Sequence, residues 1–119
     1  MKRLIVLILC ILFLATEALA QPSISARGSG AFTSSQVVVA RAARLSDLGV
    51  QTDGTAAVTV LLYDNATAAT GKVIAFAYVP AGSTVGGWNC PIPVYVAAGI
   101  YAAVSGTGIT RIIVSFDPQ

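Results

Sequence analysis

Short apolar segments separated by turn residues fill the chain from Gln36 onward, and this pattern limits the fold to the all-β class. In the segment Ala56–Asp64 the residues alternate so that Val58, Val60 and Leu62 share one face of an extended chain. No segment after the N-terminal leader has the periodicity of an amphipathic helix. The sequence therefore predicts a single β-sandwich or jelly-roll-like domain of about seven short antiparallel strands, following an N-terminal signal helix.

The expected strands differ in how central they are. Apolar residues occupy both faces of Ala56–Asp64, which predicts a central strand, and a small polar loop joins it to Val73–Val79 as a hairpin. Pro91 and Pro93 cannot donate ladder hydrogen bonds, so they indicate an edge strand or a strand start. Gly86-Gly87 indicates an exposed connection. The full set of expected strands is Gln36–Ala43, Arg44–Gln51, Ala56–Asp64, Val73–Val79, Ile92–Val96, Ile100–Ser105 and Thr110–Phe116.

The first twenty residues, 1–20, have the pattern of a secretory signal peptide. Lys2 and Arg3 precede the apolar run Leu4–Leu14, and Ala18-Leu19-Ala20 matches the small-residue cleavage pattern. This pattern predicts that the leader is cleaved and that the mature protein starts at Gln21 and is secreted, so that it is periplasmic or extracellular. An uncleaved leader is the alternative, and only through it would the protein contact a membrane. Residues 21–35 are rich in Ser and Gly and predict a flexible arm, which leaves 36–119 as the β-sandwich domain.

The charged residues after the leader argue against an enzyme and against nucleic acid as a partner. The only glutamate, Glu17, lies in the leader and the chain has no histidine, so the usual acid–base groups and zinc ligands are missing. The aspartates lie in turn-like contexts, where a carboxylate normally serves the backbone. We expect no catalytic residues, no cofactor and no metal. Five cations against four anions also give no basic surface: Arg27, Arg41, Arg44, Lys72 and Arg111 against Asp47, Asp53, Asp64 and Asp117.

Two neighbouring residues are the candidate ligand-binding site. Trp88 and Asn89 follow Gly86-Gly87, and an exposed Trp in such a loop can stack on a sugar ring. The other aromatic residues include Tyr63 and Tyr101, which we expect to pack across a sheet. Cys90 is the single cysteine after the leader, so it is either buried and inert or paired between chains.

Small side chains dominate the expected strands, and this composition favours self-association. Alanine buries little apolar area, so a domain of this size packed with Ala and Val gains little stability from its own core. Assembly into a homo-oligomer would bury the second apolar face of the sheets. A monomer whose aromatic residues fill the core is the alternative.

Three stretches of the chain resemble a known class of protein. The stretches Thr59–Ala75, Pro91–Gly108 and Ile112–Phe116, with L-Y-D-N at Leu62–Asn65, resemble small all-β domains of tailed-phage virion proteins, of the head decoration or head-fibre type. The resemblance implies a compact domain, often trimeric, that reinforces or adheres to a surface. It implies no catalytic residues. The leader departs from that class, because virion proteins normally lack an export signal.

Two functional classes follow from these observations. The first is a non-catalytic structural or interaction protein that acts by surface attachment and homo-oligomeric assembly, with a trimer favoured, on a capsid, a virion or a cell surface. The second is an exported carbohydrate-binding module that recognises a surface glycan through Trp88 and Asn89.

Overall fold

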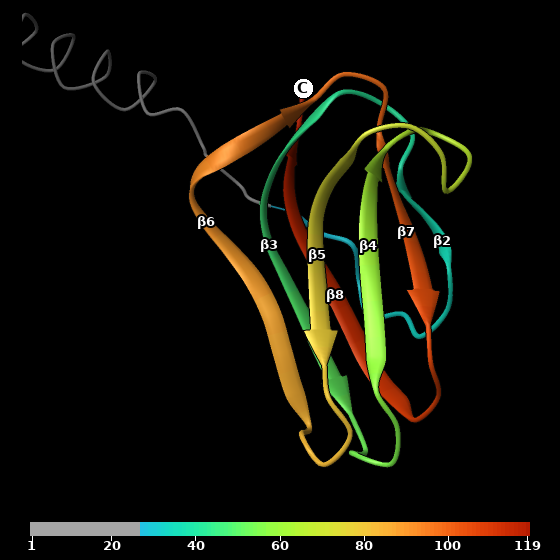
Figure 1. The fold of residues 1–119 in the computed structure, drawn as a ribbon. Coiled ribbons are helices and arrows are strands. Elements are labelled where there is room, and N and C mark those ends of the chain that lie inside the picture. Colours follow the sequence, from blue (N-terminus) through green and yellow to red (C-terminus); the bar gives the residue numbers. More distant parts are fainter. Residues whose placement is uncertain (1–26) are drawn as a thin grey trace, which may run out of the picture.

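The computed structural model describes residues 27–119, so the expected leader and residues 21–26 of the expected arm lie outside the described part of the chain. Eight strands follow one another along the described residues (Figure 1). Their bounds are β1 Arg27–Gly28, β2 Gln36–Val39, β3 Ala43–Thr52, β4 Val58–Asp64, β5 Val73–Val79, β6 Val85–Val96, β7 Ile100–Ser105 and β8 Ile109–Pro118.

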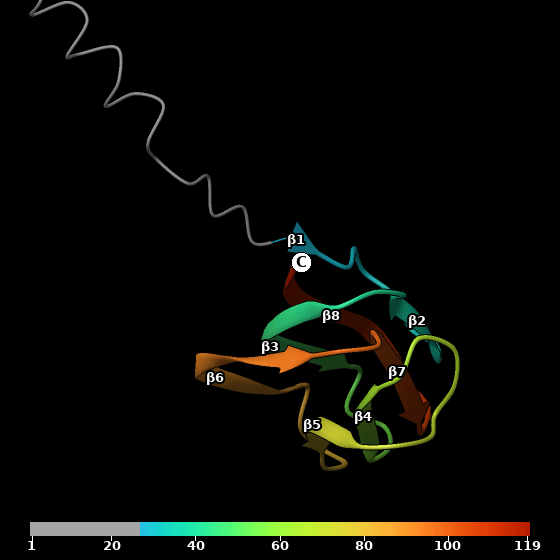
Figure 2. The same ribbon diagram turned by 90° about the horizontal axis from the view of Figure 1, so that it is seen from above.

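The strands form two four-stranded sheets that lie one against the other like the layers of a sandwich. One sheet has the order β1-β8-β3-β6 and the other the order β2-β7-β4-β5, and every neighbouring pair is antiparallel. Figure 2 shows the two layers from above. This arrangement confirms the all-β expectation, and none of residues 27–119 forms a helix long and apolar enough to cross a membrane.

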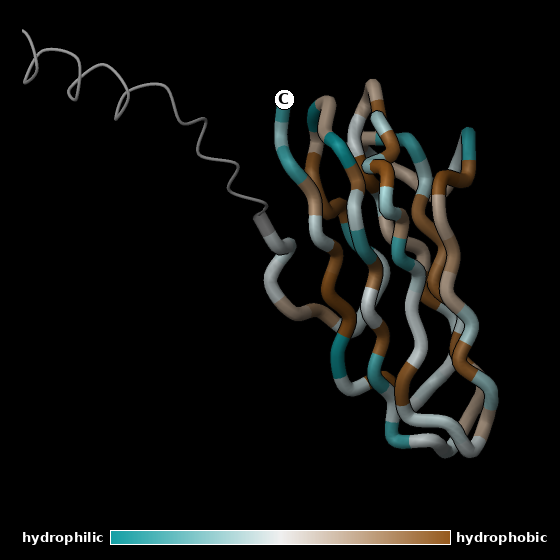
Figure 3. Tube along the Cα trace, turned by 90° about the vertical axis from the view of Figure 1, so that its left-hand side faces the viewer, coloured by the Kyte–Doolittle hydropathy of each residue, from teal (hydrophilic) through white to brown (hydrophobic). Residues whose placement is uncertain are grey.

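The core lies between the two sheets and is built from alternate residues of each strand. In β4 the side chains of Val58, Val60 and Leu62 are fully buried, as the alternation predicts. Leu48 and Val50 of β3 meet them from the other sheet. Hydrophobic and more polar positions alternate along the strands in Figure 3 for the same reason.

Strand β4 has the central position and the hairpin partner that the sequence predicts. It lies between β5 and β7, and its hairpin with β5 places Val58 opposite Val79. On its other side Tyr63 lies directly opposite Tyr101 of β7, so these two aromatic residues are cross-strand neighbours.

The described part of the expected arm is bound to the domain, which corrects the boundary at residue 36. Arg27–Gly28 pairs with the edge of β8, and the N–H and C=O groups of Phe32 exchange hydrogen bonds with Ile112. The Phe32 side chain is buried in the core. Without this segment the outer edge of β8 would expose unpaired backbone groups. The signal in the sequence is weak, because one phenylalanine stands alone among small polar residues.

The expected connection at Gly86-Gly87 is wrong, because both glycines lie inside β6. A Cβ atom added at Gly86 would lie 2.6 Å from Cγ2 of Val79, and one at Gly87 would lie 2.6 Å from the carbonyl oxygen of Leu48. Close approach of neighbouring strands, rather than a turn, therefore requires glycine here. The edge position expected for the Pro91 and Pro93 segment is confirmed, since β6 is the last strand of its sheet.

Truncating a core side chain should destabilise the fold far more than truncating an exposed one. Leu48→Ala removes a fully buried side chain and should lower the free energy of unfolding by about 2–5 kcal/mol. Ile92→Ala, at a side chain that is 78% exposed, should change it by less than about 0.5 kcal/mol. Urea unfolding followed by circular dichroism measures both variants, and equal losses would contradict the assigned core.

Candidate functional site

The outer face of the β2-β7-β4-β5 sheet, here called the apolar face, is the strongest candidate for a functional surface. Its side chains alternate along each strand with those of the core. Cross-strand pairs connect it into rows, for example Phe76 with Leu61 and Leu61 with Ala103. The apolar face consists of Val37, Thr59, Leu61, Tyr63, Val73, Phe76, Tyr78, Tyr101, Ala103 and Ser105.

Aromatic side chains on the apolar face are open to solvent. Phe76 is 59% exposed and Tyr78 is 57% exposed on the edge strand β5, and Tyr63 of β4 and Tyr101 of β7 form a half-buried cross-strand pair on the same face. Fully burying one large apolar side chain is worth about 1.5–3 kcal/mol. Leaving these rings in water therefore forgoes several kcal/mol that contact with another surface would recover.

Charge distinguishes the apolar face from the opposite side of the molecule. The apolar face has only neutral side chains, whereas the outer face of the β1-β8-β3-β6 sheet, here called the polar face, carries both signs of charge. Arg44 lies opposite Asp117 there, and Asp47 and Arg111 lie further along the same face. The outer face of one sheet is thus free of charge and carries Phe76 and Tyr78, whereas the outer face of the other sheet carries both signs of charge together with one exposed ring, Tyr95 opposite Arg44.

The structure does not bring Trp88 and Asn89 together as one site. Trp88 lies in β6 directly opposite Leu48, whose side chain is buried, and it packs half-buried against the core. Asn89 lies opposite Asp47 on the polar face. Consecutive residues of a strand point to opposite faces. The loop expected around Trp88 is therefore wrong, and its ring is a packing element at the edge of the core.

Two of the four aspartates hold the backbone of connections, as the sequence predicts. The carboxylate of Asp64 accepts hydrogen bonds from the N–H groups of Ala97 at 3.3 Å and Ala98 at 3.0 Å, which ties the β6–β7 turn to the end of β4. Asp53 accepts hydrogen bonds from the N–H group of Thr55 at 2.9 Å and from its hydroxyl at 2.6 Å. Asp47 and Asp117 lie within strands, so the turn context expected for them is wrong.

These contacts lower the pKa values of both turn carboxylates. Burial alone would raise the pKa of Asp64, but the N–H groups of Ala98, Ala97 and Gly99, together with the Lys72 charge, outweigh it and lower the pKa. The hydroxyl and N–H hydrogen bonds from Thr55 lower the pKa of Asp53. Among residues 27–119, no three His, Cys, Asp or Glu side chains gather as a metal site.

Strand β6 carries a bulge that the sequence pattern did not predict. Its pairing with β3 passes from Leu45–Val94 to Asp47–Asn89, so residues 90–93 stand opposite Ser46 alone. Cys90 is half-buried in this bulge and its thiol donates to the carbonyl oxygen of Ile92. A pairing of Cys90 between chains stays a prediction.

Comparisons with protein-family models, with curated proteins and with solved structures find no match to this chain. The apolar face had a signal in the sequence, because Leu61 and Tyr63 alternate with the core residues of β4. That the outer face of this sheet carries no charge could be seen only from the strand pairing.

Substitutions at Trp88 and Asn89 should change the free energy of unfolding by different amounts, because the two side chains lie on opposite faces of β6. Trp88→Ala removes a ring that packs against the core and should lower the free energy of unfolding by about 1–3 kcal/mol. Asn89→Ala, one residue along on the polar face, should change it by less than about 0.5 kcal/mol. Chemical denaturation of the two variants measures the difference. A destabilisation confined to Asn89→Ala would contradict the orientation of β6.

Asp64 should make the stability of the protein depend on pH in the acid range. Because its pKa is lower in the folded protein than the ordinary value of 3.8, ionised Asp64 stabilises the fold above that value, and this contribution is lost as the pH falls through the folded pKa. Asp64→Asn should therefore reduce the loss of unfolding free energy between neutral pH and acid. Urea titrations at a series of pH values measure this slope. Identical slopes in the two proteins would contradict the assignment.

Proposed function

We propose that the protein is a non-catalytic structural or interaction protein that assembles with copies of itself and attaches to a surface. The observation that carries this proposal is the charge-free, aromatic outer face of one sheet, opposite a face that holds charges of both signs. Buried charges are costly unless they are paired, and two apolar faces can meet without burying any charge. A second copy of the chain supplies a surface of matching chemistry.

The extent of the apolar face is that of a functional patch, and its composition supports self-association. Four strands spaced about 4.8 Å apart and about seven residues long make a face of roughly 400 Å² in projection. Apolar patches of about 300–600 Å² are the largest that typical monomers expose, and such patches are often functional. With Phe76 and Tyr78 projecting from it, the apolar face has the size and composition of a contact surface.

The order of the strands supports a jelly-roll-like architecture within the sandwich. Eight strands in the orders β1-β8-β3-β6 and β2-β7-β4-β5 connect the two sheets at almost every step along the chain. Jelly rolls of eight strands occur in viral capsid and lectin domains. This architecture agrees with the virion-type resemblance, from which we also propose a trimer on a capsid, virion or cell surface. A dimer, in which two identical apolar faces lie directly against each other, is the alternative assembly, and its mass in sedimentation distinguishes it from the trimer.

The proposed location follows from the leader. A signal peptide cleaved after Ala20 would deliver the domain as a secreted protein, periplasmic or extracellular, and a virion surface is the alternative location. We propose no enzymatic activity, no cofactor and no nucleic-acid partner. The carbohydrate-binding alternative loses support at Trp88, because its ring packs against the core.

A charge placed on the apolar face should dissociate the oligomer. Phe76→Glu puts a carboxylate into the contact, whereas Ile92→Glu puts the same charge at an exposed position on the β6 bulge. Sedimentation of the purified protein at tens of micromolar should give a mass above that of one chain for the wild type and Ile92→Glu. Phe76→Glu should sediment as a monomer with an unchanged circular dichroism spectrum.

The same experiment can contradict the proposal in two ways. A wild-type protein that is monomeric at every concentration would exclude assembly. An oligomer that dissociates in Ile92→Glu and persists in Phe76→Glu would place the contact on the β6 bulge instead of the apolar face.

A further inference from the structure

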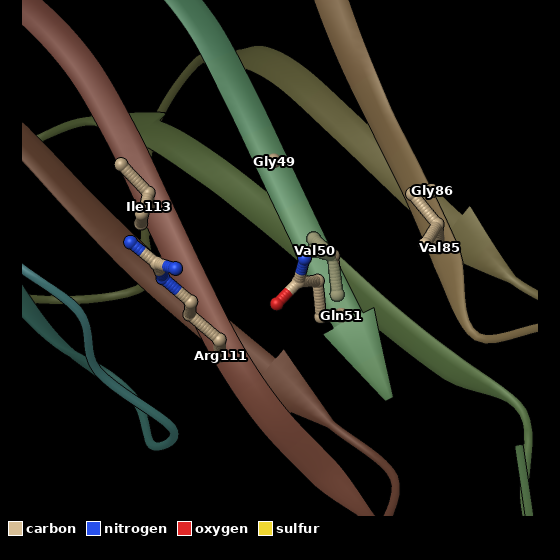
Figure 4. Close-up of a pocket in the computed structure, with 7 residues that line it drawn as sticks. All are labelled: Gly49, Val50, Gln51, Val85, Gly86, Arg111 and Ile113. Atoms are coloured by element: carbon tan, nitrogen blue, oxygen red, sulfur yellow. The ribbon is translucent and has the colours of Figure 1, made fainter. Parts of the chain in front are cut away.

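The polar face contains a hollow of about 230 Å³ over β3, β6 and β8. Figure 4 shows Gly49 and Gln51 on β3 between Arg111 and Ile113 of β8 and Val85 of β6. The hollow lies on the sheet opposite the apolar face, so it stays open when copies of the chain meet through that face.

Gly49 forms the floor of the hollow, and the fold itself does not require glycine there. A Cβ atom added at Gly49 would meet no atom within 4 Å, and its φ is not positive. Glycine in the middle of a strand costs about 0.5–1 kcal/mol relative to alanine. By contrast, a side chain at Gly87, its partner on β6, would collide with the backbone of Leu48. A glycine without a steric reason in a central strand is typical of a position that a ligand approaches closely.

Polar side chains flank the glycine floor at both ends. Gln51 lies two residues along β3 in one direction, with Arg111 opposite it on β8. Asp47 lies two residues along in the other direction, between Asn89 of β6 and Ser115 of β8. At about 3.4 Å per residue, these two polar rows stand about 14 Å apart.

The side chains around the hollow match a neutral, hydroxyl-rich ligand. Arg111 offers only donors, Asp47 offers only acceptors, and the amides of Gln51 and Asn89 offer both. A sugar hydroxyl both donates and accepts, so it can use each of these groups. A charged polymer long enough to cover both polar rows would meet a like charge at one of them, at Asp47 if it is anionic and at Arg111 if it is cationic. Val85 and Ile113 supply aliphatic surface for the C–H groups of a sugar ring.

We propose that this hollow binds a hexose unit of a neutral polysaccharide through Gln51 and Arg111, and that Asn89, in the other polar row, binds a further unit of the same polysaccharide. The proposal rests on the proposed attachment function and names the chemistry of the attachment partner. It keeps Asn89 as a ligand-binding residue and replaces the stacking role of Trp88 by contact with the bare backbone of Gly49.

The test is a titration of the isotope-labelled full chain with maltotriose, cellotriose and triacetylchitotriose, followed by NMR. At least one of these neutral trisaccharides should shift the amide signals of Gly49, Asn89 and Arg111. Gly49→Val should fill the hollow and weaken binding at least about tenfold, which is about 1.4 kcal/mol. Its fold should persist, because valine suits a strand and open space lies above Gly49. Thr110→Val, an exposed valine substitution on the same sheet outside the hollow, should bind like the wild type.

Two results would overturn the proposal. One is the absence of shifts at the hollow with all three trisaccharides, and the other is undiminished binding by Gly49→Val. Sedimentation of the same samples separates this outcome from a failure of the proposed assembly. An intact oligomer that binds no trisaccharide contradicts the saccharide site alone, and a monomer that binds through the hollow contradicts assembly alone.

Discussion

Burial of one face of each sheet between the two layers is the interaction on which the rest of the structure depends. The fully buried side chains are almost all Leu, Ile and Val, with Ala43 and Ala102 beside them, and they come from alternate positions in both sheets. Because a strand alternates strictly, each core residue commits its neighbours to an outer face. The core therefore determines which residues the two outer faces present, and the chemistry of those faces follows from it.

The two outer faces differ in chemistry. One collects Phe76, Tyr78 and their neighbours without any charge, and the other collects Arg44, Asp47, Arg111 and Asp117 around a glycine floor. The turn carboxylates Asp53 and Asp64 are engaged by backbone N–H groups, which leaves them as parts of the fold. We propose that copies of the chain assemble through the apolar face and that a saccharide binds on the polar face.

Sequence patterns predicted the parts of this structure that depend on local alternation. They located β4, β5 and β7 and the central place of β4, because apolar runs between clear turn residues mark these strands and β4 alternates without interruption. They failed at Gly86 and Gly87, because glycine is common both in turns and at places where strands lie very close together. The sequence suggests a turn, but Val79 and Leu48 leave no room for a side chain at these positions within β6. They also missed Phe32, since its contacts lie eighty residues along the chain at Ile112. The ligand-binding site expected at Trp88 and Asn89 was predicted only in part. The register of β6 shows that the two side chains point to opposite faces of the sheet, and this register cannot be read from the sequence.

The central claim is that the apolar face is covered by a second copy of the chain. The most direct measurement is the NMR relaxation that a soluble paramagnetic probe induces in methyl groups, recorded over a dilution series. We predict that the methyls of Leu61, Ala103 and Val37 are shielded at high protein concentration and become accessible on dilution, while those of Val85 and Ile92 stay accessible throughout. If the methyls of Leu61, Ala103 and Val37 were at every concentration as accessible as they are in the Phe76→Glu variant, the account would be contradicted.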